Sequence, residues 1–124
     1  MQVLSVLISV SIISLVCPAT VLAEGDAARG KQLFSRCAAC HSIEGKNKSG
    51  PALNGVFGRK AGAMEGYRYS TALLNSAVVW SDETLDAFLS GPSKMLRGTR
   101  MTTSVLSEAD RADIVAYLKT LPAQ

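Results

Sequence analysis

The pattern of apolar and polar positions divides the chain into an apolar leader and a charged remainder. Residues 3–16 are apolar apart from serines, whereas all 13 basic and all 10 acidic residues lie at or after Glu24. In the charged part, apolar residues recur at helical spacing, and glycine-rich polar stretches separate the segments. The pattern predicts helices joined by loops, and a length of 124 residues indicates one domain.

Helix start signals mark the two ends of this domain. Asp26 can cap a helix over residues 27–36. Ser107 and Asp110 form an S-x-x-D start for a last helix, whose apolar residues recur at helical spacing until the next proline. Gly30 costs the first helix about 1 kcal/mol against alanine, which indicates close approach by another element. We expect that element to be the last helix.

Two further helices are predicted between these ends. Residues 70–75 can form a short one, and Ser81 caps a clearer one that ends at Gly91. Residues 55–66 hold four glycines and are typical of an Ω-like loop. Residues 93–105 are predicted to be irregular.

The leader resembles a secretory signal that ends in the small residue Ala23, just before Glu24. The prediction is a signal peptide over residues 1–23 and a mature domain over residues 24–124, exported to the periplasm. The leader has no Lys or Arg, although signals usually begin with positive charge. The alternative is an uncleaved anchor, because residues 3–23 approach the roughly 20 residues that a membrane span needs.

The candidate chemistry is concentrated in Cys37-Ala38-Ala39-Cys40-His41, which matches the c-type haem attachment pattern. Residues at i and i+3 share a helical face, so both thiols can reach one edge of a porphyrin. The cofactor prediction is one haem c, covalent through Cys37 and Cys40, with His41 on the iron. Two other interpretations of the motif fit less well. A structural zinc site would need four ligands, and a thioredoxin-like redox pair would need a βαβ context.

The single histidine excludes bis-histidine ligation, so the sixth iron ligand must be another residue type. A thioether is the natural partner for low-spin iron. Met101 lies in an irregular stretch that can turn its side chain inward, while Met95 and Met64 are rival candidates. A metal-bound histidine generally donates its free ring N–H to a carbonyl or carboxylate, and from the sequence alone Pro51 is a turn residue.

The net charge of +3 is too modest and too scattered for nucleic-acid binding. It suits a transient acidic protein partner instead. The candidate docking charges flank the motifs expected around the haem: Arg36, Lys46, Lys48, Lys60, Lys94, Arg97 and Arg100.

The charged part of the chain resembles class I cytochromes c, in particular the bacterial cytochrome c2 and mitochondrial cytochrome c branch. The residues that carry the resemblance span Gly25 to Leu121: Gly30, Phe34, the haem motif, Gly50-Pro51-Ala52-Leu53, Gly55-Val56-Phe57-Gly58-Arg59-Lys60, Gly66-Tyr67-Arg68-Tyr69, Trp80, Gly98-Thr99-Arg100-Met101 and Ala116-Tyr117-Leu118.

This resemblance implies an all-α fold of three to five helices and Ω-like loops around one haem, with the terminal helices crossing. It implies that Met101 is the axial methionine and that the Pro51 carbonyl holds the His41 ring. Further haem-binding residues would face the buried propionates: Arg59, Tyr69 and Trp80. Three residues depart from the family pattern, namely Phe88 for tyrosine, Leu73 for asparagine and Thr103 for an aromatic residue.

The expected function is that of a soluble, monomeric electron carrier that touches membrane complexes transiently and is not an enzyme. One alternative is a dedicated electron-accepting subunit of a dehydrogenase. Another, motivated by Phe88 and Thr103, is a haem peroxidase or gas sensor whose methionine ligand detaches.

Overall fold

The computed structural model describes residues 24–123, so the predicted leader over residues 1–23 lies outside the described residues. The described chain is helical, and its one strand-like pairing is an isolated bridge between Lys60 and Val79. The elements in chain order are α1 (Ala27–Leu33), the 3₁₀ helix η1 (Phe34–Arg36), α2 (Thr71–Leu74), α3 (Asp82–Ser90), α4 (Pro92–Met95) and α5 (Glu108–Lys119). The all-α prediction is confirmed.

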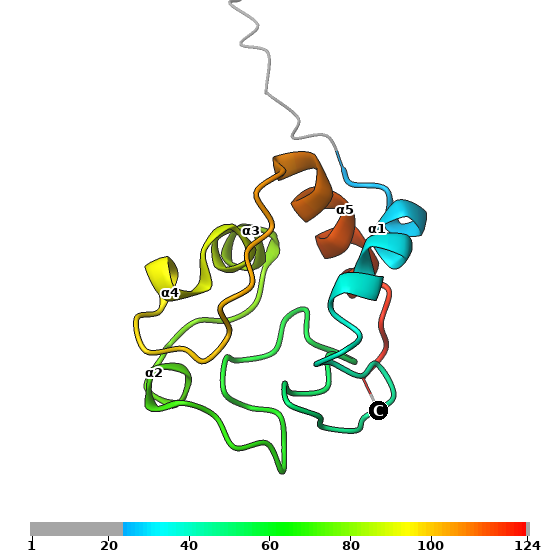
Figure 1. Ribbon diagram of the computed structural model, residues 1–124. Helices are drawn as coiled ribbons and strands as arrows, with labels where there is room; N and C mark the ends of the chain where they lie inside the picture. The colour runs from blue at the N-terminus through cyan, green and yellow to red at the C-terminus, as the bar shows by residue number, and fades with distance from the viewer. Residues whose placement is uncertain (1–23, 124) are drawn as a thin grey trace, which may run out of the picture.

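The first and last helices pack side by side, as Figure 1 shows for α1 and α5. A Cβ at Gly30 would collide with the backbone carbonyl of Asp113, so only glycine permits this approach. Asp113 is 8% exposed and accepts hydrogen bonds from the Asp26 backbone N–H (2.7 Å) and from Arg29. These two bonds hold the pKa of Asp113 below its ordinary value. The crossing is therefore stabilised by close backbone approach and by an ion pair whose acidic partner is buried and whose arginine is half exposed.

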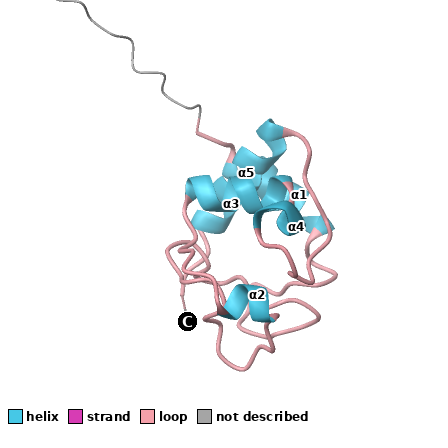
Figure 2. Cartoon of the chain, turned by 90° about the vertical axis from the view of Figure 1, so that its left-hand side faces the viewer, coloured by secondary structure: helices cyan, strands magenta, loops and turns pink. Residues whose placement is uncertain are grey.

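Helix α3 completes the helical half of the molecule. Ser81 and Thr84 form its capping box, and the buried face presents Leu85, Phe88 and Leu89 toward the core. The helix ends where Gly91 caps it, as predicted. In Figure 2, α1, α3 and α5 gather in one half of the molecule, while α2 and the long loops occupy the other.

Helix α4 differs from the prediction, which gave residues 93–105 as irregular. This helix has four residues, begins with Pro92 and has no side-chain cap. Four residues are about one turn, too short to show an apolar repeat.

The region between η1 and α2 consists of turns, which agrees with the predicted Ω-like loop over residues 55–66. Gly58 and Gly62 there have φ of 82° and 77°, a conformation that glycine adopts without strain. Over residues 24–123, no helix combines the length and apolar character needed to cross a membrane.

Candidate functional site

A cavity of about 340 Å³ lies between the helices and the loops. Helix residues such as Leu85, Ile114 and Leu118 line it from one side, and loop residues such as Leu53 and Val56 line it from another. The lining includes every site residue named from the sequence: Cys37, Cys40, His41, Pro51, Arg59, Tyr69, Trp80 and Met101. The fold thus gathers around one hollow residues that lie up to 64 positions apart in the chain.

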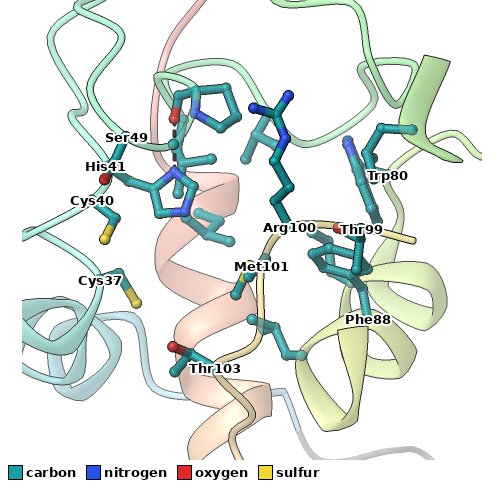
Figure 3. A pocket seen from close by; sticks show the side chains of 18 of the residues that line it. Cys37, Cys40, His41, Ser49, Trp80, Phe88, Thr99, Arg100, Met101 and Thr103 are labelled. Carbon is teal, nitrogen blue, oxygen red and sulfur yellow. Dashed lines mark hydrogen bonds between the residues drawn. The ribbon is translucent and has the colours of Figure 1, made fainter. Parts of the chain in front are cut away.

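The haem attachment motif forms one wall of the cavity, directly after η1. Backbone bonds from Cys40 N to the Cys37 carbonyl (3.0 Å) and from His41 N to the same carbonyl (2.9 Å) wind it into a helical turn. In Figure 3 the two thiols and the imidazole project from this turn toward the same space. The half-buried Cys37 and the exposed Cys40 can both therefore reach a planar group in the cavity.

The ring of His41 is fixed by a hydrogen bond between its Nδ1 and the Pro51 carbonyl oxygen at 2.7 Å. Since a carbonyl can only accept, Nδ1 carries the proton and Nε2 keeps a free lone pair. Burial lowers the pKa of His41, and the positive charge of Lys48 acts in the same direction. The imidazole is thus neutral at physiological pH, the state that a metal ligand requires.

Gly50 gives the imidazole its room. A Cβ on Gly50 would stand 2.7 Å from Nδ1 of His41 and closer still to Cε1. This position, singled out in the sequence only through the family resemblance, therefore shapes the cradle of the ring.

The opposite wall comes from α3 and from the segment after α4. Figure 3 shows Met101, Thr99, Phe88 and Trp80 across the cavity from His41. The rings of Phe88 and Trp80 pack with centroids 5.0 Å apart. Leu73 also lines the hollow.

Met101 differs from the two rival methionines in its position. Among the described residues that line this cavity, Met101 is the only methionine. Met64 lines a separate hollow that Arg59 also borders, and Met95 packs against the hydrophobic core. The geometry therefore favours Met101 as the thioether that faces His41.

Arg59 provides a half-buried positive charge among the loop residues that line the cavity. Its guanidinium donates to the carbonyl oxygens of Asn54 (3.1 Å) and Ala52 (3.0 Å). Its Nε is buried and has no hydrogen-bond partner among the described residues. Burial lowers the pKa of Arg59, but arginine stays charged in proteins. An unpaired buried donor on a cation fits an acidic group bound in the cavity.

Tyr69 adds a hydroxyl beside this charge. Its Oη accepts a hydrogen bond from the Met64 backbone N–H at 3.1 Å. Burial raises the pKa of Tyr69, so the phenol keeps its proton and can donate it. A cavity with apolar walls, two thiols and one cationic end fits a flat, mostly apolar cofactor with acidic substituents.

Sequence reasoning missed one group of residues around this site. Ser49 lines the cavity, and the exposed Asn47, two residues earlier, makes hydrogen bonds to two backbone groups. Both occur in a polar loop without periodicity, where asparagine and serine are ordinary turn residues. Nothing local in the sequence distinguishes them.

The chain was compared with known proteins, and a family model described as cytochrome c matches residues 27–122. The chain belongs to the cytochrome c family. It is 52% identical to cytochrome c of Euglena viridis over 100 residues, which cover 78% of this chain and 98% of the relative. It is 49% identical to cytochrome c-type cyt cy of Rhodobacter capsulatus over 107 residues, which cover 85% of this chain and 53% of the relative.

The fold of the cytochrome is also that of a solved relative. The structure of cytochrome cH from Methylobacterium extorquens matches with a TM-score of 0.75 and 44% identity, covering 77% of this chain and 99% of the other. The resemblance found in the sequence is thereby confirmed. As a member of this family, the protein carries one haem c, covalently bound through Cys37 and Cys40, and it is an electron-transfer protein rather than an enzyme.

Proposed function

We propose that this cytochrome is a monomeric periplasmic carrier of single electrons whose haem iron is ligated by His41 and Met101. The observation that carries the proposal is the placement of these two side chains on opposite walls of one cavity. The haem, when bound, supplies an iron that alternates between the ferrous and ferric states. If His41 and Met101 both bind the iron, they would leave it no open site for a substrate.

The residues that line the cavity have different proposed roles. His41 is held in the ligating tautomer by the Pro51 carbonyl. The apolar lining excludes water, which together with a thioether ligand favours the ferrous state and raises the potential. Arg59, Tyr69 and Trp80 line the same cavity, and their proposed role is to neutralise or hydrogen-bond the haem propionates. Such compensation matters because a buried carboxylate without a partner costs several kcal/mol.

Docking of an acidic partner is supported by the distribution of ion pairs. The ion pairs of the described chain join α1, η1, α3 and α5 on the helical half of the molecule. Of the seven candidate docking cations, Arg36 forms an ion pair, with Asp110 at 3.6 Å. Among residues 24–123, the other six appear in none of the ion pairs: Lys46, Lys48, Lys60, Lys94, Arg97 and Arg100. Unpaired cations steer an acidic partner and speed its encounter more than they tighten the complex.

The ligand assignment is tested by spectra and potentials of Met101→Ala beside Met64→Ala. We expect Met101→Ala to lose the low-spin ferrous features and to lower the potential, because the thioether is gone. Met64→Ala is the matched control and should keep the spectrum of the native protein. An unchanged spectrum in Met101→Ala would rule out this ligand.

The periplasmic location is proposed from the leader and needs its own test. Fractionation of cells that produce the full chain, with the mass of the protein, should find the holoprotein in the periplasm beginning at Glu24. A membrane-bound protein that retains residues 1–23 would instead support the anchor.

A gas sensor or peroxidase is the second candidate function, favoured by one observation. Within residues 24–123, no backbone N–H from Arg100 to Ser104 donates a backbone hydrogen bond, so the Met101 segment is held by side-chain contacts, namely a bond from Arg100 to the Arg68 carbonyl and the packing of Met101 on the core. Rapid binding of carbon monoxide by the untreated ferrous protein would support this candidate, whereas failure to bind would support the carrier. A third candidate, a dedicated dehydrogenase subunit, would co-purify in a stoichiometric complex at high salt.

A further inference from the structure

The peptide group between Pro51 and Ala52 is hydrogen-bonded at both ends. Its carbonyl oxygen accepts from Nδ1 of His41 at 2.7 Å, and its N–H donates to Oδ1 of Asn47 at 3.0 Å. Ala52 is fully buried, so Asn47 supplies the acceptor that this N–H cannot obtain from water. One rigid peptide plane therefore connects the side chains of Asn47 and His41.

The orientation of the Asn47 amide follows from its two partners. The Ala52 N–H can only donate, so it faces the amide oxygen. The Glu65 carbonyl can only accept, and it lies 2.9 Å from Nδ2. A continuous chain of bonds thus runs from the Glu65 carbonyl through Asn47 and the peptide to the imidazole.

We propose that Asn47 is a positioning residue that tunes the haem iron through the Pro51–Ala52 peptide and His41. Hydrogen bonds in a chain polarise one another. The amide oxygen of Asn47 polarises the Ala52 N–H, and this increases the negative charge on the Pro51 carbonyl oxygen. The carbonyl then accepts more strongly from Nδ1 of His41, so the imidazole becomes a stronger electron donor to the iron. A more basic histidine favours the ferric state. The inference rests on the proposed ligation of the iron by His41.

Two substitutions at this position predict potential shifts of opposite sign. Asn47→Leu removes the acceptor, so the ratio of ferrous to ferric protein at a fixed applied potential should rise by about threefold. At 59 mV per tenfold change, this corresponds to a rise in the reduction potential of about 30 mV. Asn47→Asp keeps an acceptor and adds negative charge, so the ratio should fall. A residue that merely held the two loops together would shift both variants in one direction, because both lose the bond to Glu65.

The electrostatic effect of the added charge in Asn47→Asp needs a separate control, because any nearby carboxylate favours the ferric iron. Lys46→Gln changes the net charge by the same amount at the neighbouring residue, whose side chain makes none of the side-chain hydrogen bonds or ion pairs in the described chain. We expect a smaller shift from Lys46→Gln than from Asn47→Asp, and one that high salt screens. Equal shifts in the two variants would overturn the proposal.

Hydrogen exchange gives a readout independent of the potential. In the diamagnetic ferrous protein, NMR should show faster exchange of the Ala52 amide and of the His41 Nδ1 proton in Asn47→Leu, and near-native exchange in Asn47→Asp. Native exchange and a native potential in Asn47→Leu would overturn the role of Asn47. If Asn47→Leu fails to fold, the comparison of Asn47→Asp with Lys46→Gln decides.

The failure of this inference is distinguishable from that of the proposed function. A native protein whose spectrum lacks histidine and methionine ligation refutes both. A normal native spectrum, together with equal shifts from Asn47→Asp and Lys46→Gln, refutes only the role of Asn47.

Discussion

Replacing Arg59 with leucine tests how far a half-buried cation holds the loop half of the cytochrome together. The leucine would fill much of the space of the arginine stem but would leave the Ala52 and Asn54 carbonyls without their donors. Both residues are buried, at 0% and 6% exposed, so water cannot replace those bonds. A hydrogen bond from a charged donor contributes about 1.5–3 kcal/mol, and two predict a loss of about 3–6 kcal/mol.

This loss is large against the about 5–15 kcal/mol that stabilises an ordinary domain. Urea unfolding of the holoprotein, followed by far-ultraviolet circular dichroism, is the assay. With a slope of about 1–3 kcal/mol per molar urea, the midpoint should fall by at least about 1 M. The potential should fall as well, because removing a positive charge near the haem favours the ferric state.

Arg59→Lys is the matched variant for the same reasoning. It keeps the charge, but one ammonium group does not present the planar fork that spans two carbonyls. We expect about half the loss of unfolding free energy and a near-native potential. A leucine variant within about 1 kcal/mol of the native protein would show that the two carbonyl bonds contribute little net stability.

Three further outcomes are expected. Gly50→Ala forces a methyl group against the His41 ring and should cost about 1–3 kcal/mol in urea unfolding, with loss of low-spin iron. The pKa of Asp113 is lowered in the folded protein, so the Asp113 carboxylate contributes fully to the free energy of unfolding above its unfolded pKa of about 3.9. This contribution is lost as the pH falls further. In acid unfolding experiments, the free energy of unfolding of Asp113→Asn should therefore converge with that of the native protein. Lys94→Gln should slow electron transfer to an acidic partner at low salt, while Lys119→Gln, whose ammonium pairs with an α3 carboxylate, should not.

The helices could be predicted from the sequence wherever their start depends on adjacent residues. Asp26, Ser81 and Ser107 each accept hydrogen bonds from the first turn of the helix that follows, as their spacing predicted. The crossing of α1 and α5 was also indicated, because Gly30 makes sense only if a backbone approaches it. Helix α4 was missed because four residues carry no repeat.

The residues of the candidate site also differ in whether they could be predicted from adjacent residues in the sequence. Cys37, Cys40 and His41 form a local motif that the sequence displays directly, whereas the roles of Met101, Pro51, Arg59, Tyr69 and Trp80 came from family resemblance and stay predictions until spectra and potentials test them. The bonds that Asn47 makes could not be predicted at all. They join irregular loops through one backbone donor and one backbone acceptor, and such backbone partners place almost no requirement on residue type.

The segment from Pro51 to Asn54 connects the His41 side of the cavity with the Arg59 side. Its carbonyls accept from His41 at Pro51 and from Arg59 at Ala52 and Asn54, while its Ala52 N–H is bound by Asn47. Four consecutive residues thus touch both the proposed iron ligand and the proposed propionate partner. A displacement of this short segment is therefore expected to disturb the hydrogen bonds of both His41 and Arg59, which couples the proposed iron ligand to the proposed propionate partner.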